Sequence, residues 1–265
     1  MNPLDIALEA AAAASQILLD KRGRVSEVGT KQNQTDLVSE ADLTAEAAVV
    51  GLIRRQFPTH IIIAEEGAAG GTDADHRWFI DPLDGTTNYV HGHPFFAVSI
   101  AYERHGELVA AVIAAPTLDE LFIAERGSGA RLNGQPISVS AVDKLDLAML
   151  ATGFAYSVPE RRANVSLWRA FIPRSLALRR DGAAALDLAY VAAGRFDGYW
   201  EWPLNSWDIA AGLLLVREAG GLVSGYHGET INLDRPAIVA SNGLIHPAML
   251  AVIGETLPSM EVQPT

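Results

Sequence analysis

The sequence has 265 residues, of which 49% are hydrophobic and 20% are charged, and its formal net charge is −12. This length allows one large domain or two small ones, and the composition is ordinary for a soluble globular protein. An acidic chain is not expected to bind a nucleic acid backbone directly, because that requires a basic face, and a chain without cysteine cannot form disulfides or thiolate metal sites.

The first segment predicts a helix over residues 4–22. Pro3 stands where the first turn of a helix tolerates proline, and Gly23 ends the segment. The segment has no basic start, and Asp5 and Glu9 interrupt its apolar run, so we expect a helix of the folded protein rather than a signal peptide. The sequence has no apolar run of 18 or more residues, which predicts no membrane span and favours a cytoplasmic location.

A second helix is expected to end at Pro58, which cannot continue a helix. Leu43, Ala47, Val50 and either Ile53 or Arg54 recur at helical spacing within it and mark one face. We expect this face to be the buried one.

Strand signals follow this helix. The run HIIIAEEG ends in Glu65 and Glu66, and the run RWFIDP ends in Asp81 and Pro82, and both predict buried strands. Residues 95–140 contain further strand-like runs separated by turn signals rich in glycine and proline. This pattern predicts an antiparallel meander.

Helix and strand signals alternate in the second half of the chain, which is typical of an α/β arrangement. The predicted strands are residues 147–153, 176–182, 196–202 and 237–243. The predicted helices are residues 160–171, 183–193 and 207–219 and a last one from about residue 245. We place a division near residue 145, between an α+β half of residues 1–145 and an α/β half of residues 146–265. No linker rich in proline or serine separates the halves, so we expect them to pack tightly.

The stretch WFIDPLDGTTNYVHG is the first candidate for a functional site. Asp81 directly follows an apolar strand, where a carboxylate without a partner is costly. Gly85, Thr86 and Thr87 offer backbone N–H groups and hydroxyls of the kind that hold an anion at a helix N-terminus. The pair of Asp84 and Gly85 is also common in turns, so an ordinary turn is the alternative.

Glu65 and Asp208 also lie at the ends of predicted elements. If they approach Asp81 and Asp84, each close pair of carboxylates repels by about 4 kcal/mol at about 4 Å with an effective dielectric constant near 20. Such a cluster is tolerable only if it is protonated or filled by cations, and hard cations such as Mg²⁺ prefer oxygen ligands. Spacing along the chain does not establish that the four side chains converge.

Several separated motifs resemble, in order, those of the inositol monophosphatase family. WFIDPLDGTTN (residues 78–88) resembles the first signature of that family, and WDIAAG (residues 207–212) resembles the second. AEEG matches the upstream glutamates, and DLVSEAD (residues 36–42) matches the segment before the second helix. The resemblance covers nearly the whole chain, and it implies a layered α-β-α-β-α sandwich with an antiparallel N-terminal sheet and a C-terminal α/β part.

The resemblance also implies a role for each matching residue. The implied ligands of two or three Mg²⁺ ions, with Asp81 bridging two of them, are Glu65, Asp81, Asp84, Asp208 and the carbonyl of Leu83. The implied donors of N–H groups to phosphate are Gly85 and Thr86. The groups implied to orient and deprotonate a water are Thr86, Asp42 and Glu65. The implied substrate contacts are Asp84, Gly182, Ala183, Ala184 and Glu201. Lys31 matches a basic residue near the site.

The activity that the resemblance implies is Mg²⁺-dependent, lithium-sensitive hydrolysis of inositol monophosphate or a similar small polyol phosphate. Histidinol phosphate, fructose 1,6-bisphosphate and nucleotide 3′-phosphate are alternatives, because Ala183 and the pair Asn205-Ser206 differ from the polar residues of animal members. A mainly protein-binding role is an alternative of another class, because some bacterial relatives act as partners of RNA-handling machinery. We expect a homodimer, by resemblance and because the apolar segments HPFFAV and RFDGYWEW are predicted to be exposed.

Overall fold

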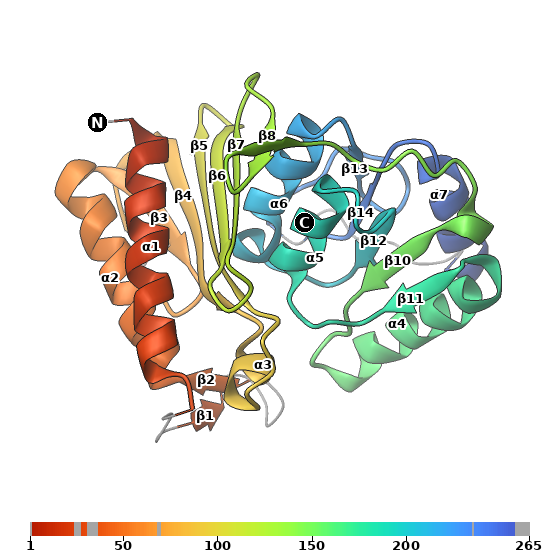
Figure 1. Cartoon of the computed structure of the whole chain (residues 1–265), viewed down its shortest axis with the longest axis horizontal. Helices are drawn as coiled ribbons and strands as arrows, with labels where there is room; N and C mark the ends of the chain where they lie inside the picture. The colour runs from red at the N-terminus through yellow and green to blue at the C-terminus, as the bar shows by residue number, and fades with distance from the viewer. Residues whose placement is uncertain (1, 24–27, 31–36, 68–69, 235, 258–265) are drawn as a thin grey trace.

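The chain folds into five stacked layers of helices and sheets (Figure 1). The computed structural model describes residues 2–23, 28–30, 37–67, 70–234 and 236–257. Two helices cover one face of a large sheet, two lie between this sheet and a smaller one, and two cover the outer face of the smaller sheet. The α-helices are α1 (Pro3–Lys21), α2 (Glu40–Gln56), α3 (Thr86–Val90), α4 (Val158–Phe171), α5 (Ala184–Ala192), α6 (Ser206–Glu218) and α7 (His246–Thr256). The predicted α-β-α-β-α sandwich is therefore confirmed.

The large sheet has the strand order β3-β4-β5-β6-β7-β8-β9. Its strands are β3 (His60–Ala64), β4 (Asp73–Asp84), β5 (Ala97–Arg104), β6 (Glu107–Ala115), β7 (Glu120–Glu125), β8 (Ala130–Leu132) and β9 (Gln135–Ile137). The strands from β4 to β9 pair antiparallel, as the meander prediction requires. The edge strand β3 pairs parallel with β4, which the prediction of an antiparallel sheet did not include. A separate ribbon joins β1 (Val28–Thr30) to β2 (Leu37–Ser39).

The smaller sheet is mixed and has the order β11-β10-β12-β14-β13. Its strands are β10 (Met149–Thr152), β11 (Ala177–Arg179), β12 (Gly198–Glu201), β13 (Leu222–Ser224) and β14 (Ile238–Ser241). Strand β10 pairs parallel with β11 and β12, whereas β14 pairs antiparallel with β12 and β13. The sequence analysis missed β13, because three residues are too few to display a period of two.

Helices α5 and α6 connect the two halves of the chain. The large sheet ends at Ile137 and the smaller sheet begins at Met149, and both α5 and α6 pack between them. Phe79 and Phe122 of the large sheet share one core with Leu188 of α5. The division near residue 145 remains a prediction, since helices of the second half complete the core of the first.

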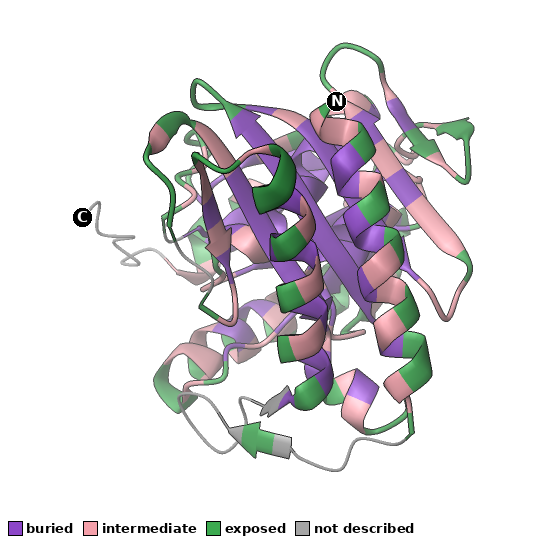
Figure 2. Ribbon diagram, turned by 90° about the vertical axis from the view of Figure 1, so that its left-hand side faces the viewer, coloured by how far each residue is buried: buried purple, intermediate pink, exposed green. Residues whose placement is uncertain are grey.

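Helices α1 and α2 turn their buried faces to the large sheet and their exposed faces to solvent (Figure 2). Val50 and Ile53 are buried as predicted, but Leu43 is 53% exposed and Ala47 is exposed, so that part of the predicted face is wrong. The cause is the phase of the helix, since Asp42 is fully buried at its first turn and the next residue points about 100° away. Within the described ranges, no helix is long and apolar enough to cross a membrane.

The two apolar segments that were expected to be exposed are buried in the chain's own cores. Phe95 and Phe96 of HPFFAV are 9% and 0% exposed, and Phe196 and Trp200 of RFDGYWEW are 5% and 0% exposed. Trp200 stacks on Phe171 of α4 with ring centroids 4.1 Å apart. Of these two segments only Pro94 is an exposed apolar residue and Trp202 a partly buried one, so their large buried side chains do not support a dimer surface, and the prediction of a homodimer depends on the resemblance.

Candidate active site

Strand β4 contains the first part of the WFIDPLDGTTN motif and ends at Asp84. A β-bulge lies at this end of the strand. Asp81 pairs with Ser99 and Asp84 with Ala97, so β4 has one more residue than β5 in this interval. Such bulges re-aim side chains and interrupt the ladder, which also makes room for Pro82 within the strand. Asp81 and Asp84 are only 2% and 7% exposed. Two carboxylates that are this buried need partners, which an ordinary turn does not require.

Gly85 turns the chain from β4 into α3. Its φ of 93° lies in the left-handed region, and a Cβ at this position would lie 3.1 Å from the carbonyl oxygen of Phe95 and 3.3 Å from the Cβ of Ala183. Glycine meets both demands because it has no side chain. The turn brings the backbone N–H groups of Gly85 and Thr86 to the end of β4, where the sequence analysis predicted a phosphate.

Thr86 is the contact point between α3 and α2. Its hydroxyl lies 2.9 Å from Oδ1 of Asp42 and 3.1 Å from the carbonyl oxygen of Leu83, and it can donate its hydrogen to either. Asp42 is held from the other side, because its Oδ2 accepts a hydrogen bond of 2.9 Å from the backbone N–H of Ser39, in a capping box at the start of α2. Thr86 and Asp42, 44 residues apart, thus meet as the resemblance implied.

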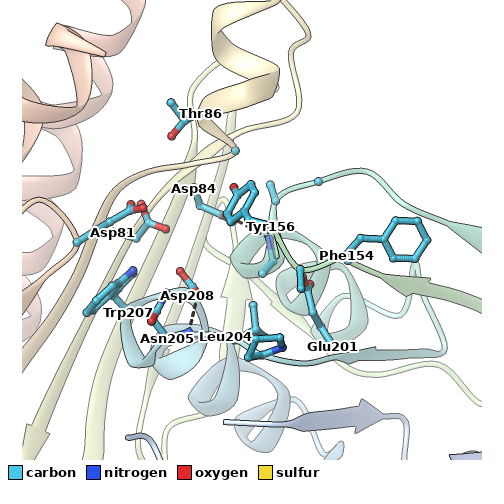
Figure 3. A pocket seen from close by; sticks show the side chains of 18 of the residues that line it. Asp81, Asp84, Thr86, Phe154, Tyr156, Glu201, Leu204, Asn205, Trp207 and Asp208 are labelled. Carbon is cyan, nitrogen blue, oxygen red and sulfur yellow. Dashed lines mark hydrogen bonds between the residues drawn. The ribbon is translucent and has the colours of Figure 1, made fainter. Parts of the chain in front are cut away.

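A pocket with a volume of about 540 Å³ brings most of the predicted residues together. Figure 3 shows Asp81, Asp84 and Asp208 at one end of this pocket and Glu201 toward the other. The predicted residues that line it are Glu65, Asp81, Leu83, Asp84, Gly85, Thr86, Gly182, Ala183, Ala184, Glu201 and Asp208. Asp42 contacts Thr86 without lining the pocket itself, and Lys31 lies outside the described residues.

Two of the acids are placed by the N-termini of helices. The carboxylate of Asp84 accepts hydrogen bonds from the backbone N–H groups of Ala184, at 3.1 Å, and Ala185, at 2.7 Å, in the first turn of α5. Asp208 is the third residue of α6, and its Oδ2 accepts a hydrogen bond of 2.6 Å from the backbone N–H of Asn205. The sequence analysis missed the contact of Asp84 with α5, which joins segments about 100 residues apart.

Burial and mutual repulsion raise the pKa values of these acids. The pKa of Asp81 is well above its ordinary value because of burial first and then the charges of Glu65, Asp84 and Asp208. Burial raises the pKa of Asp84 to about 7, and burial followed by the charge of Glu65 raises that of Asp208. Cations would relieve both effects at once. A set of carboxylate oxygens and one backbone carbonyl, without sulfur or nitrogen, fits a hard cation such as Mg²⁺.

Glu201 occupies the pocket wall at the end of β12. The hydroxyl of Tyr199 donates a hydrogen bond to it, and burial raises its pKa to about 7. A Cβ at Gly153 would lie 2.0 Å from the carboxylate oxygens of Glu201, so the side chain occupies space that only a glycine leaves open. This carboxylate is suited to bind the hydroxyls of a ligand, since Asp81, Asp84 and Asp208, which are predicted to bind metal, lie at the other end of the pocket (Figure 3).

Other pocket residues did not stand out in the sequence. Phe154, Tyr156 and Trp207 add aromatic surface, and Arg180 adds a positive charge. Phe154 and Tyr156 lie between the predicted strand 147–153 and the predicted helix 160–171, outside the motifs that carry the resemblance. Arg180 lies in the predicted strand 176–182, just before the implied substrate contacts from Gly182 to Ala184, and Trp207 is the first residue of the second motif.

A second group of possible metal ligands lies outside this pocket. His60, Asp73 and His76 each place one ligand atom within 4.8 Å of the others. The rings of His60 and His76 are stacked, however, with centroids 4.5 Å apart and an angle of 6° between their planes. Nitrogen lone pairs lie in the ring plane, and nearly parallel planes do not meet at one ion. Trp78 also donates a hydrogen bond of 3.1 Å to Nδ1 of His60, so this group packs as an aromatic stack.

Comparisons with known proteins identify the family of the chain. The sequence profile of the inositol monophosphatase family matches residues 2–257. The chain is 44% identical to the Nus factor SuhB of Pseudomonas aeruginosa, with 97% of this chain and 98% of that protein covered. It is 43% identical to the inositol-1-monophosphatase of Mesorhizobium japonicum, with 96% and 97% covered. The solved structure of a Thermotoga maritima IMPase superposes with a TM-score of 0.90 at 39% identity, covering 97% of this chain and 99% of that one. The chain therefore belongs to the inositol monophosphatase family.

Proposed function

We propose that the protein is a Mg²⁺-dependent phosphomonoesterase that hydrolyses inositol monophosphate or a similar small polyol phosphate. The observation that carries this proposal is the convergence of Glu65, Asp81, Asp84 and Asp208 in one pocket beside the turn at Gly85. Four acids at one place are stable only when they are protonated or bind cations, and an acidic pocket needs cations to hold a phosphate. The inositol-1-monophosphatase of M. japonicum, at 43% identity, supports the choice of substrate.

The residues that would hold the Mg²⁺ ions are the four acids and the carbonyl of Leu83. Bound Mg²⁺ would lower the pKa of a water and stabilise negative charge on the phosphoryl group during in-line displacement. The N–H groups of Gly85 and Thr86 would hold the phosphate oxygens, since they lie where α3 begins.

Thr86 and Asp42 would orient the attacking water. The hydroxyl hydrogen of Thr86 is directed to Asp42 or to the carbonyl of Leu83, at 2.9 and 3.1 Å. A lone pair of the Thr86 oxygen then remains to accept a hydrogen bond from a water in the pocket. Glu65, on the same side of the pocket, would contact the same water and accept its proton.

The polyol would lie over the first residues of α5, toward Glu201. The N–H of Ala184 already donates to Asp84, so it does not bind a substrate hydroxyl. Gly182 and Ala183 would instead line the ring, and Glu201 would accept hydrogen bonds from its hydroxyls. Asp84 would contact the substrate from the metal side.

Hydrolysis of a substrate panel tests this proposal. Purified protein with Mg²⁺ is given inositol 1-phosphate, histidinol phosphate, fructose 1,6-bisphosphate and a nucleotide 3′-phosphate, and phosphate release is measured. We expect the highest kcat/KM on inositol 1-phosphate or a similar polyol phosphate and no turnover in excess chelator. Faster release from histidinol phosphate or the nucleotide would contradict the substrate class, and turnover in chelator would contradict the metal requirement.

A protein-binding role is a second candidate, favoured by the 44% identity to a protein named Nus factor SuhB. If the chain has both functions, Thr86→Val should lower the rate of hydrolysis roughly 100-fold and leave partner capture intact. Capture from a lysate of the source organism that is lost together with hydrolysis would contradict an independent binding role.

The chain is also proposed to act as a cytoplasmic homodimer. Light scattering at micromolar concentration should give twice the chain mass of 28.3 kDa. A mass equal to one chain would contradict the dimer and would leave the pocket, which one chain builds, unaffected.

A further inference from the structure

Arg180 places a positive charge at the edge of an acidic pocket, and this charge opposes the effect of burial, which raises the pKa values of Asp181, Asp187 and Glu201. It is the only lysine or arginine among the described residues that line the pocket. Its guanidinium forms no hydrogen bond or ion pair with any residue that the structure describes, and the side chain is exposed. Its five N–H donors are therefore available to a ligand.

The guanidinium is nevertheless held in place. It lies over the ring of Phe154, 5.9 Å from the ring centroid, in a cation–π contact. Phe154 in turn packs edge-on against Trp168 of α4, with centroids 5.6 Å apart. This packing keeps the charge at the end of the pocket that holds Glu201, where Figure 3 shows Phe154.

The backbone between Arg180 and the predicted phosphate site is short and fixed. A Cβ at Gly182 would lie 2.6 Å from Nη1 of Arg180, so glycine leaves room for the guanidinium beside the pocket floor. The side-chain amide of Asn88, in α3, donates a hydrogen bond of 2.7 Å to the carbonyl of Asp181. Only Asp181 and Gly182 lie between Arg180 and Ala183, so the Cα atoms of Arg180 and Ala183 are at most about 11 Å apart, at about 3.8 Å for each step along the chain. This is the length of a small sugar or polyol phosphate.

We propose that Arg180 binds a second anionic group, a carboxylate or a phosphate, on the alcohol part of the substrate. The inference rests on the proposed phosphatase function and names a substrate class for it, phosphate esters that carry a second anion. The planar guanidinium matches the oxygens of both groups in a two-point contact. The surrounding acids, Glu160, Glu201 and Asp234, would repel such a group without Arg180.

Two matched pairs of substrates test the proposal. 2-Phosphoglycerate differs from glycerol 2-phosphate in a carboxylate in place of a hydroxymethyl group, and fructose 1,6-bisphosphate differs from fructose 1-phosphate in a second phosphate. The ratio of kcat/KM within each pair measures the preference for the second anion. We expect the wild type to prefer the anionic member, and Arg180→Ala to lower the ratio roughly 10- to 100-fold, as for the loss of a charged hydrogen bond. Arg180→Lys should lower it less.

Arg179→Ala is the matched control. Arg179 is the neighbouring exposed arginine, it donates to the carbonyl of Leu178 and it does not line the pocket. This variant should keep both ratios. If Arg180→Ala lowers the kcat/KM ratio of one substrate pair only, the proposal is supported, and that pair identifies the second anion as a carboxylate or a phosphate. Ratios that Arg180→Ala leaves unchanged in both pairs, with a melting temperature equal to that of the wild type, would overturn it.

A binding measurement separates this inference from the phosphatase proposal. Calorimetry with Ca²⁺ in place of Mg²⁺ gives Kd for each member of the two pairs without turnover. If the wild type hydrolyses none of the four esters, the proposed function fails. The Kd ratios then decide the role of Arg180: a preference for the anionic members that Arg180→Ala removes supports it, and equal Kd values within both pairs overturn it.

Discussion

Replacing Asp84 by asparagine should change the metal-free stability in opposite directions at low and high pH. The carboxyl group of Asp84 accepts hydrogen bonds from the backbone N–H groups of Ala184 and Ala185. An asparagine side chain has one oxygen and can satisfy only one of them, while its NH₂ group faces the other. Leaving a buried N–H without an acceptor costs about 1–3 kcal/mol. At about pH 4, where the ionisation of the unfolded chain has only begun, this is the main effect, so Asp84→Asn should be less stable than the wild type.

The ionisation of Asp84 has the opposite effect, because it destabilises the wild type and not the variant. Burial, opposed by the hydrogen bond from Ala185, raises the pKa of Asp84 from its ordinary value of 3.8 to about 7. Because the pKa is raised in the folded state, the unfolded chain ionises first, and the wild type loses stability as the pH rises from about 4 to about 7. The difference corresponds to about 4 kcal/mol. The variant does not have this loss, so at pH 8 it should be more stable by about 1–3 kcal/mol, or roughly 5 °C in melting temperature.

Melting in excess chelator at five values between about pH 4 and about pH 8 measures this crossover. Glu218→Gln is the control, because Glu218 also accepts two backbone N–H groups, those of Gly127 and Gly129 at 2.9 Å each, and does not line the pocket. This control variant should melt below the wild type at every pH. An equal shift in melting temperature for Asp84→Asn at about pH 4 and about pH 8 would refute the reasoning. With Mg²⁺ present, Asp84→Asn should also lower the rate of hydrolysis roughly 100-fold or more. A near-normal rate would show that Asp84 is not a metal ligand.

Four further outcomes are expected. Thr86→Val should lower the rate of hydrolysis roughly 100-fold with little change in melting temperature, whereas Thr86→Ser should keep most of the rate. Equal losses of rate in these two variants would show that the hydroxyl does not take part in hydrolysis. Glu201→Gln should raise KM for inositol 1-phosphate more than for p-nitrophenyl phosphate, and equal losses would give Glu201 a structural role. Gly153→Ala, which displaces Glu201, should show the same selectivity. Ca²⁺ should inhibit turnover in Mg²⁺, because it is larger and less strictly octahedral, and lithium chloride should inhibit more than sodium chloride.

Much of the fold was predictable, because long periodic segments dominate it. The ends of α1, α4, α5 and α6 lie within two residues of the predicted ones, since proline, glycine and polar caps mark them in the sequence. Short elements such as β13, and the parallel pairing of β3 with β4, were not predictable. Their formation depends on neighbours supplied by distant parts of the chain and not on local pattern.

The residues of the site were predictable as types, but their contacts were not. The motif around Asp81 and Asp84 indicated carboxylates at a strand end, and only the fold shows a bulge that turns both into one pocket. The buried face of α2 was partly wrong for a related reason. Its phase follows Asp42, a polar residue that faces Thr86, whereas the sequence pattern assigned the inner face by hydrophobicity alone.

Three of the predicted site acids lie at helix N-termini, and this explains how an acidic cluster persists in a folded chain. Asp42 and Asp208 occupy the third position of α2 and α6, each bonded to the backbone N–H of the residue that precedes its helix. Asp84 accepts two N–H groups of α5 from across the structure. A helix N-terminus has a partial positive charge that stabilises nearby carboxylates by about 0.3–1 kcal/mol each, and up to about 2 kcal/mol when partly buried. This is less than the repulsion of about 4 kcal/mol in each close pair. The helices therefore orient the acids but do not neutralise them, and the remaining charge is what the proposed metal ions would balance.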